Sequence, residues 1–150
     1  MILLDANLLI YAVNRDAPLH AKAKAWIESA LSGGETVAFT WIALLAFLRL
    51  TTRPGLFHKA LPLETVFDLI DSWLAQPAAT LIHPGPRHHH VLRTLLVPLG
   101  TGGNLTSDAH LAALAIEHRA ELCSSDGDFA RFAGLRWRNP LAGKNPKITS

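Results

Sequence analysis

The feature that most constrains this chain is the alternation of short apolar runs with longer segments of helical periodicity. Mostly apolar runs such as Ile2–Leu4 and Val37–Thr40 are only three or four residues long. Runs of this kind, bounded by polar or turn residues, are typical of strands that are buried on both faces. Strands that alternate with helices predict an α/β fold with a mainly parallel sheet.

The pattern predicts about five strands and six helices in one domain. The strands are expected at Ile2–Leu4, Val37–Thr40, Thr80–His83, Glu121–Ser124 and Leu135–Arg138. The helices are expected at Leu8–Val13, Pro18–Ser32, Trp41–Thr51, Leu63–Ala75, Pro86–Leu99 and Leu105–His118, with Asn7 as the cap of the first. No internal repeat or long linker divides the chain. We therefore expect a single domain over residues 1–141 and a polar tail over residues 142–150.

Composition excludes several classes of protein. The chain is 49% hydrophobic and 17% charged, which excludes disorder as the dominant state. Its longest apolar stretch, Trp41–Leu48, is too short to cross a bilayer, so we expect no membrane contact. The first residues lack a basic leader and are interrupted by Asp5, unlike a signal peptide. The single cysteine, Cys123, is interpreted as a core residue and fits a reducing cytoplasm.

Four aspartates lie at element ends that a parallel sheet should bring together. Asp5 follows the first strand, Asp126 and Asp128 follow the fourth, and Asp108 lies in the first turn of a helix. Ligands of open α/β sheets bind beyond the carboxyl ends of the strands. Clustered carboxylates repel one another unless a cation joins them, and hard oxygen ligands select Mg²⁺ or Mn²⁺. Such an ion can activate water for attack on a phosphodiester. Taken alone, Asp108 also has a structural explanation, because an acid there interacts favourably with the helix dipole.

Neighbouring polar residues suggest how a polyanion would bind. Once the four aspartates are assigned to a metal, the remaining charge is basic, and the chain as a whole carries +2. Helical geometry places Arg49 on one face with Ala46, the position that the resemblance described below assigns to the acidic site, and there it could hold a phosphate. Asn7 and either Thr106 or Ser107 could orient water or phosphate at the same edge, although capping and turn formation explain them equally well.

Four segments, taken in order, carry a family resemblance: MILLDANLLIYA, AFLRLTTRP, GNLTSDAHLAALAIEH and SSDGDFARFAGLRWRNPL. Together they resemble the PIN-domain toxins of bacterial VapBC toxin–antitoxin systems, from Met1 to about Leu141. The resemblance implies a PIN-like three-layer α/β/α domain, usually a homodimer, that cleaves RNA with Mg²⁺ or Mn²⁺. It makes Asp5, Asp108 and Asp126 the metal-site aspartates and Asp128 a nearby acid. It also implies a VapB-type antitoxin whose tail fills the acidic groove, with operator DNA bound only through that antitoxin.

One position departs from the family pattern. The family usually has a glutamate before the FLR segment, and Ala46 stands there in this chain. An alanine side chain can neither ligate a metal nor orient a water molecule. The subgroup could work with its other acids, the alanine could be an engineered inactivating change, or the protein could be a weakly active member.

Two other functional classes are weighed against a nuclease. A catalytically silent module would keep the antitoxin groove and regulate operator binding, and Ala46 motivates this alternative. A signalling receiver would need an aspartate after the third strand and a lysine after the last, where this chain has His83-Pro84 and Asn139-Pro140.

The remaining polar residues are given simple interpretations. The run His88–His90 is interpreted as a solvated helix start, and His110 is assigned no role. Glu117 and Glu121 are interpreted as surface charges.

Overall fold

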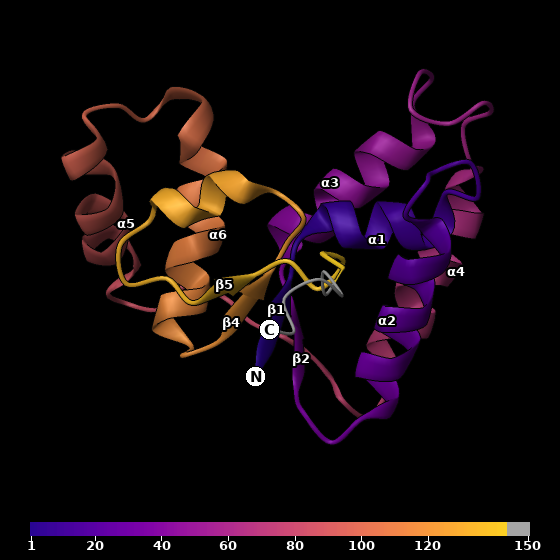
Figure 1. Cartoon of the computed structure of the whole chain (residues 1–150), viewed down its shortest axis with the longest axis horizontal. Helices are drawn as coiled ribbons and strands as arrows, with labels where there is room; N and C mark the ends of the chain where they lie inside the picture. The colour runs from indigo at the N-terminus through magenta and orange to yellow at the C-terminus, as the bar shows by residue number, and fades with distance from the viewer. Residues whose placement is uncertain (144–150) are drawn as a thin grey trace, which may run out of the picture.

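A single parallel sheet organises the protein. In the computed structural model, which describes residues 1–143, five strands lie side by side with helices on both faces (Figure 1). They are β1 (Ile2–Leu4), β2 (Val37–Phe39), β3 (Ala79–Leu81), β4 (Glu121–Cys123) and β5 (Trp137–Arg138). Their order in the sheet is β3-β2-β1-β4-β5, and every neighbouring pair is parallel. The predicted α/β fold is confirmed, with β1 at the centre of the sheet.

Six α-helices connect the strands, close to the expected positions. They are α1 (Ala6–Val13), α2 (His20–Ser32), α3 (Trp41–Thr52), α4 (Leu63–Leu74), α5 (His88–Leu96) and α6 (Thr106–Glu117). Three short 3₁₀ segments, which the sequence pattern did not predict, are η1 (Val97–Leu99), η2 (Gly103–Leu105) and η3 (Gly127–Arg131). The α5 helix was expected to reach Leu99 but gives way to η1, because Pro98 lacks the N–H that an α-helix needs. Among residues 1–143, none of the helices is both long and apolar enough to span a bilayer.

The core consists of two apolar layers, one on each face of the sheet. Ile2 and Leu4 face the layer that contains Phe39 and Phe47, where α1 to α4 pack. Leu3 faces the opposite layer, where α5 and α6 pack. This alternation follows from the two-residue period of a strand. Cys123 is fully buried in the core as predicted, and burial raises the pKa of its thiol to about 11.

A polar network joins α5 to α6 and corrects two expectations. The ring nitrogens of His88 contact two partners: Nδ1 lies 2.6 Å from Glu117 Oε2, and Nε2 lies 2.8 Å from His110 Nδ1. The other oxygen of Glu117 accepts the backbone N–H of Gly85 at 3.2 Å. The Glu117 side chain is only 9% exposed, so it is not the surface charge that was expected. Likewise, His88 is not part of a solvated helix start.

Replacing Glu117 with alanine is expected to lower the free energy of unfolding by about 2 kcal/mol, because His88 and the Gly85 N–H lose their shared acceptor. Urea unfolding followed by circular dichroism measures the change. The matched control is Asp68→Ala, which removes an exposed acid of α4 and should change stability by less than about 0.5 kcal/mol. Equal midpoints for the parent and Glu117→Ala would contradict the role given to this network.

Candidate functional site

Asp5 is held where the central strand passes into a helix. Its backbone N–H donates to Cys123 O at 3.0 Å, which continues the pairing of β1 with β4. Its side chain caps α1, since Oδ1 accepts the N–H of Ala6 at 2.8 Å. The prediction that Asn7 caps this helix is therefore wrong. The helix begins two residues earlier than expected because Asp5 is itself a strong capping residue.

Ser124 is the residue that ties the site together, and the sequence interpretation missed it. It is fully buried and follows β4 directly. Its hydroxyl donates to Asp5 Oδ2 at 2.7 Å, and it accepts Asn7 Nδ2 at 3.1 Å and the N–H of Asp126 at 3.0 Å. One hydroxyl therefore fixes residues from both ends of the chain. Its signal in the sequence was a small polar residue at the end of an otherwise apolar strand.

Asp126 and Asp128 occupy different environments although they are close in sequence. Asp126 caps η3, and its Oδ1 accepts the N–H of Asp128 at 2.9 Å. Asp126 is half-buried, whereas Asp128 is exposed and pairs with Arg131 at 3.3 Å. The local turn thus directs Asp126 inward beside the Ser124 hydroxyl and leaves Asp128 at the rim.

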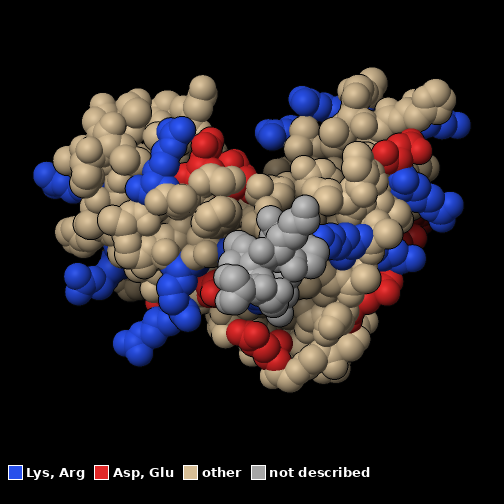
Figure 2. Space-filling view, viewed as in Figure 1, with Lys and Arg blue, Asp and Glu red and all other residues tan. Residues whose placement is uncertain are grey.

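The electrostatics show that the four aspartates do share one region. Burial raises the pKa of Asp108 to about 6, and the other three aspartates act on it in the same direction. Burial also raises the pKa of Asp5, while its hydrogen bonds to Ser124 and Ala6 oppose the rise. Figure 2 shows acidic side chains at a hollow in the upper edge of the molecule, with basic side chains on either side of it. The structure therefore brings together the acids that the sequence placed at one edge of the sheet.

The described side chains are close but do not form a ready ligand set. Within residues 1–143, no three or more His, Cys, Asp or Glu side chains are arranged so that they could hold a metal ion together. The assignment of Asp5, Asp108, Asp126 and Asp128 as metal ligands therefore stays a prediction.

Arg49 and Ser107 lie at one hollow beside this acidic group. The hollow has a volume of about 530 Å³ and is lined by Ile42, Leu45, Ala46, Leu48, Arg49 and Ser107. Ser107 directly precedes Asp108 in the first turn of α6, so the hollow reaches the helix turn that carries Asp108, although none of the four aspartates lines it. Arg49 is exposed at this position, and Thr106 is exposed at the start of α6. Arg49 thus shares a hollow with Ser107, the sequence neighbour of Asp108, and its role towards a phosphate stays a prediction.

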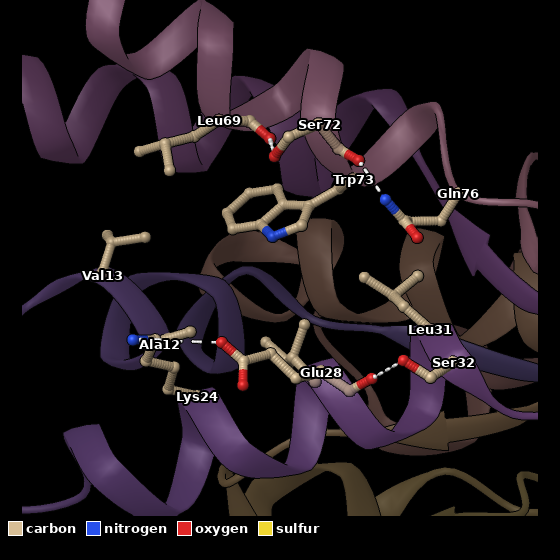
Figure 3. Close-up of a pocket in the computed structure, with 11 residues that line it drawn as sticks. Ala12, Val13, Lys24, Glu28, Leu31, Ser32, Leu69, Ser72, Trp73 and Gln76 are labelled. Atoms are coloured by element: carbon tan, nitrogen blue, oxygen red, sulfur yellow. Dashed lines mark hydrogen bonds and ion pairs between the residues drawn. The ribbon is translucent and has the colours of Figure 1, made fainter.

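A second groove lies elsewhere, between α1, α2 and α4 (Figure 3). Its volume is about 350 Å³, and Ile27, Leu31 and Trp73 give it apolar walls. Its hydroxyl groups donate within their own helices, from Ser72 to Leu69 O and from Ser32 to Glu28 O. None of the four aspartates lines this groove. It is an apolar surface, separate from the acidic group.

Comparisons with known proteins agree with this architecture. The PIN domain family model matches residues 2–135. The Mycobacterium tuberculosis protein named Ribonuclease VapC37 is 49% identical over 95% of this chain and 99% of its own length. Ribonuclease VapC33 of the same species is 43% identical over 94% of this chain and 99% of its own length.

Solved structures show the same fold at low sequence identity. VapBC2 from Rickettsia felis, solved with a DNA fragment from its promoter, aligns with a TM-score of 0.69 and 20% identity, covering 93% of this chain and 98% of that one. Mycobacterium tuberculosis VapC20, described as a sarcin-ricin loop cleaving toxin, aligns with a TM-score of 0.66 and 17% identity, covering 91% and 99%. These likenesses confirm the expected three-layer α/β/α fold.

Proposed function

The chain belongs to the PIN-domain family, among the VapC ribonucleases, and from this premise we propose that it is an endoribonuclease toxin of a type II toxin–antitoxin system. The observation that carries the proposal is the group of four aspartates, in which burial and the other three acids raise the pKa of Asp108. Acids that repel one another in a half-buried site are stabilised by a cation. A basic rim around such a site suits a polyanionic substrate such as RNA.

The donor atoms fit a hard divalent cation, Mg²⁺ or Mn²⁺. All are carboxylate oxygens, which these ions prefer over sulfur or imidazole ligands. Mg²⁺ keeps several of its waters, so we propose that one or two carboxylates bind it directly and the others act through water. This suits side chains that are close without converging. When bound, the ion would supply an activated water and offset charge on the phosphodiester.

The chain's own residues divide the remaining tasks. We propose that Asp5, Asp108 and Asp126 hold the ion and that Asp128, exposed and paired with Arg131, contributes charge at the rim. The amide of Asn7 is engaged with Ser124, which supports a positioning role inside the site rather than contact with RNA. Thr106 remains a proposed contact for substrate because it is exposed at the start of α6.

Arg49 is proposed to contact a phosphate, and this has a measurable consequence. Arg49→Gln is expected to weaken RNA binding and to reduce the salt dependence of the affinity by about one counterion. Fluorescence anisotropy at several salt concentrations measures the slope. Arg93→Gln on α5 is the matched control because Arg93 is also exposed. An equal loss of slope in both variants would show that Arg49 contributes only general charge.

The decisive experiment is cleavage of total cellular RNA with Mg²⁺, Mn²⁺ or EDTA. We expect metal-dependent cleavage by this chain, and faster cleavage by Ala46→Glu if the added carboxylate helps to hold the ion. Cleavage by Ala46→Glu alone would identify the chain as an inactivated or degenerate nuclease. Cleavage that persists in EDTA would contradict the metal mechanism. Silence of both proteins across a broad set of RNAs would favour the catalytically silent module, which Ala46 motivates.

The proposed partners follow from the same family membership. We propose a VapB-type antitoxin, a homodimer of this chain, and binding of operator DNA only through the antitoxin, all in the cytoplasm. Related folds solved as VapBC complexes, one with promoter DNA, support this assembly. Co-purification of this chain with the antitoxin, and inhibition of its RNA cleavage in the complex, is the expected result. An antitoxin that leaves cleavage unchanged would contradict the proposal.

A further inference from the structure

The hollow between α3 and the start of α6 has the composition of a ligand site. Its apolar walls come from Ile42, Leu45, Ala46 and Leu48, and its polar groups are Arg49 and Ser107. Its volume of about 530 Å³ falls within the usual range for small-molecule sites, which are mainly apolar with a few polar groups. The side chain of Leu45 is 57% exposed although it is a large apolar residue. The described chain thus leaves apolar surface open beside its acidic group.

The position of the hollow restricts what it can receive. Ser107 is the sequence neighbour of Asp108, so a molecule in the hollow would lie beside the helix turn that carries this acid. Arg49 lines the same hollow and offers a cation for a phosphate. Trp41, which is 49% exposed, lies one helical turn before Leu45, which lines the hollow, and adds an exposed aromatic residue to the same helix. An apolar wall, a hydroxyl, a guanidinium and an aromatic neighbour together match a nucleotide better than a purely apolar partner surface.

We propose that this hollow is a nucleobase subsite, which receives one unstacked base of an RNA strand adjacent to the phosphate at the acidic group. The inference rests on the proposed ribonuclease function and names a determinant of its substrate choice. The base packs against the aliphatic walls, Ser107 offers a hydrogen bond to its edge, and Arg49 contacts the neighbouring phosphate. The small side chain of Ala46 keeps the hollow open. A larger apolar side chain there, which cannot bind the ion as a carboxylate would, would occupy the space of the base.

The test fills the hollow and measures binding without turnover. Ala46→Leu is made in an Asp108→Asn background, and its binding to labelled hexaribonucleotides of adenine, cytosine or uracil is measured by fluorescence anisotropy. We expect Ala46→Leu to weaken binding of the preferred hexamer by about tenfold, because the base loses its place against the apolar walls, and to reduce the preference among the three. Ala46→Ser, which adds little volume, should stay within about twofold of its parent.

A matched control separates this effect from general damage. Ala30→Leu makes the same enlargement in a hollow of about 210 Å³ on α2, away from the acids, and should leave binding unchanged. Equal binding by Ala46→Leu and its parent, or equal weakening by Ala46→Leu and Ala30→Leu, would overturn the subsite. A change of sedimentation coefficient in Ala46→Leu with unchanged RNA binding would also overturn it, and would assign the hollow to contact with a second copy. If the unmodified chain cleaves RNA while Ala46→Leu binds the hexamers as its parent does, the subsite proposal is wrong and the proposed ribonuclease function stands. If the chain neither binds nor cleaves RNA, the proposed function fails with it.

Discussion

Replacement of Asp108 with asparagine is expected to lower RNA cleavage at least about a hundredfold while it stabilises the protein at neutral pH. The two effects have one cause, because the carboxylate that the ion requires is held in a half-buried site among three other acids. Asparagine keeps the shape of the side chain and removes its charge. Cleavage rates and urea unfolding of the metal-free protein measure the two effects separately.

The raised pKa of Asp108 determines how the stability difference between the two proteins changes with pH. The pKa of Asp108 is raised from 3.8 to about 6, so ionisation costs more in the folded chain than in the unfolded chain. The contribution of Asp108 to the free energy of unfolding is therefore largest below about pH 4, where the group is protonated. This contribution is lost as the pH rises towards about 6 and beyond. At pH 7, Asp108→Asn is expected to raise the free energy of unfolding by about 1 kcal/mol, after allowance for solvent screening of a half-exposed carboxyl. The difference between the two proteins should vanish near pH 4.

A control variant and the addition of Mg²⁺ test whether these effects are specific to Asp108. Asp71→Asn removes an exposed acid of α4 and should leave both cleavage and the pH profile unchanged. Mg²⁺ should raise the unfolding midpoint of the parent more than that of Asp108→Asn, because binding to the folded state stabilises it. Cleavage by Asp108→Asn at the parental rate would exclude the proposed site, and a variant less stable than its parent at pH 7 would contradict the electrostatic account.

The second large effect is expected from Ser124→Ala. The substitution removes one hydroxyl that bonds Asp5, Asn7 and the N–H of Asp126, all within a fully buried or half-buried environment. Leaving these partners unpaired is expected to lower the free energy of unfolding by about 3 kcal/mol. The loss of a hydrogen bond should also raise the pKa of Asp5 further, since this bond opposes the effect of burial.

Ser125→Ala is the matched control for this prediction, because it removes a hydroxyl one residue away that lies outside this set of bonds. Cleavage by Ser124→Ala, measured well below its unfolding temperature, is expected to fall by about tenfold or more as Asp5 loses its orientation. Ser125→Ala should cleave RNA at nearly the parental rate. Similar stability and activity in the two variants would show that Ser124 only fills space.

The strands could be predicted because they are buried on both faces. Ile2–Leu4 reads as an uninterrupted apolar run for this reason, and its position fixes Asp5 at the correct edge. Helical periodicity likewise placed Asp108 in the first turn of α6. These inferences succeed because they depend on local spacing and on one rule of sheet topology.

The two side chains whose roles were missed, Glu117 and Ser124, have partners that are distant in sequence. Glu117 was interpreted as a surface charge, but its partner His88 lies 29 positions earlier and meets it only after α5 packs on α6. Ser124 stood out only as a small polar residue at a strand end, and its role was hidden because its partner Asp5 lies 119 positions away. The predicted tail at residues 142–150 lies largely outside the described residues. A local sequence pattern can place a side chain at one edge of the sheet. Its role there depends on hydrogen bonds to residues that are distant in sequence.

The central position of β1 determines when, during synthesis of the chain, the acidic site can assemble. The sheet can surround β1 only when β4 reaches it, and β4 is among the last strands to leave the ribosome. Until then Asp5 has neither the hydroxyl of Ser124 nor the acid of Asp126 beside it. A nascent chain that lacks residues 121–138 therefore has no assembled acidic site. Under the proposed function, the chain would therefore have no nuclease activity until its last strands pair.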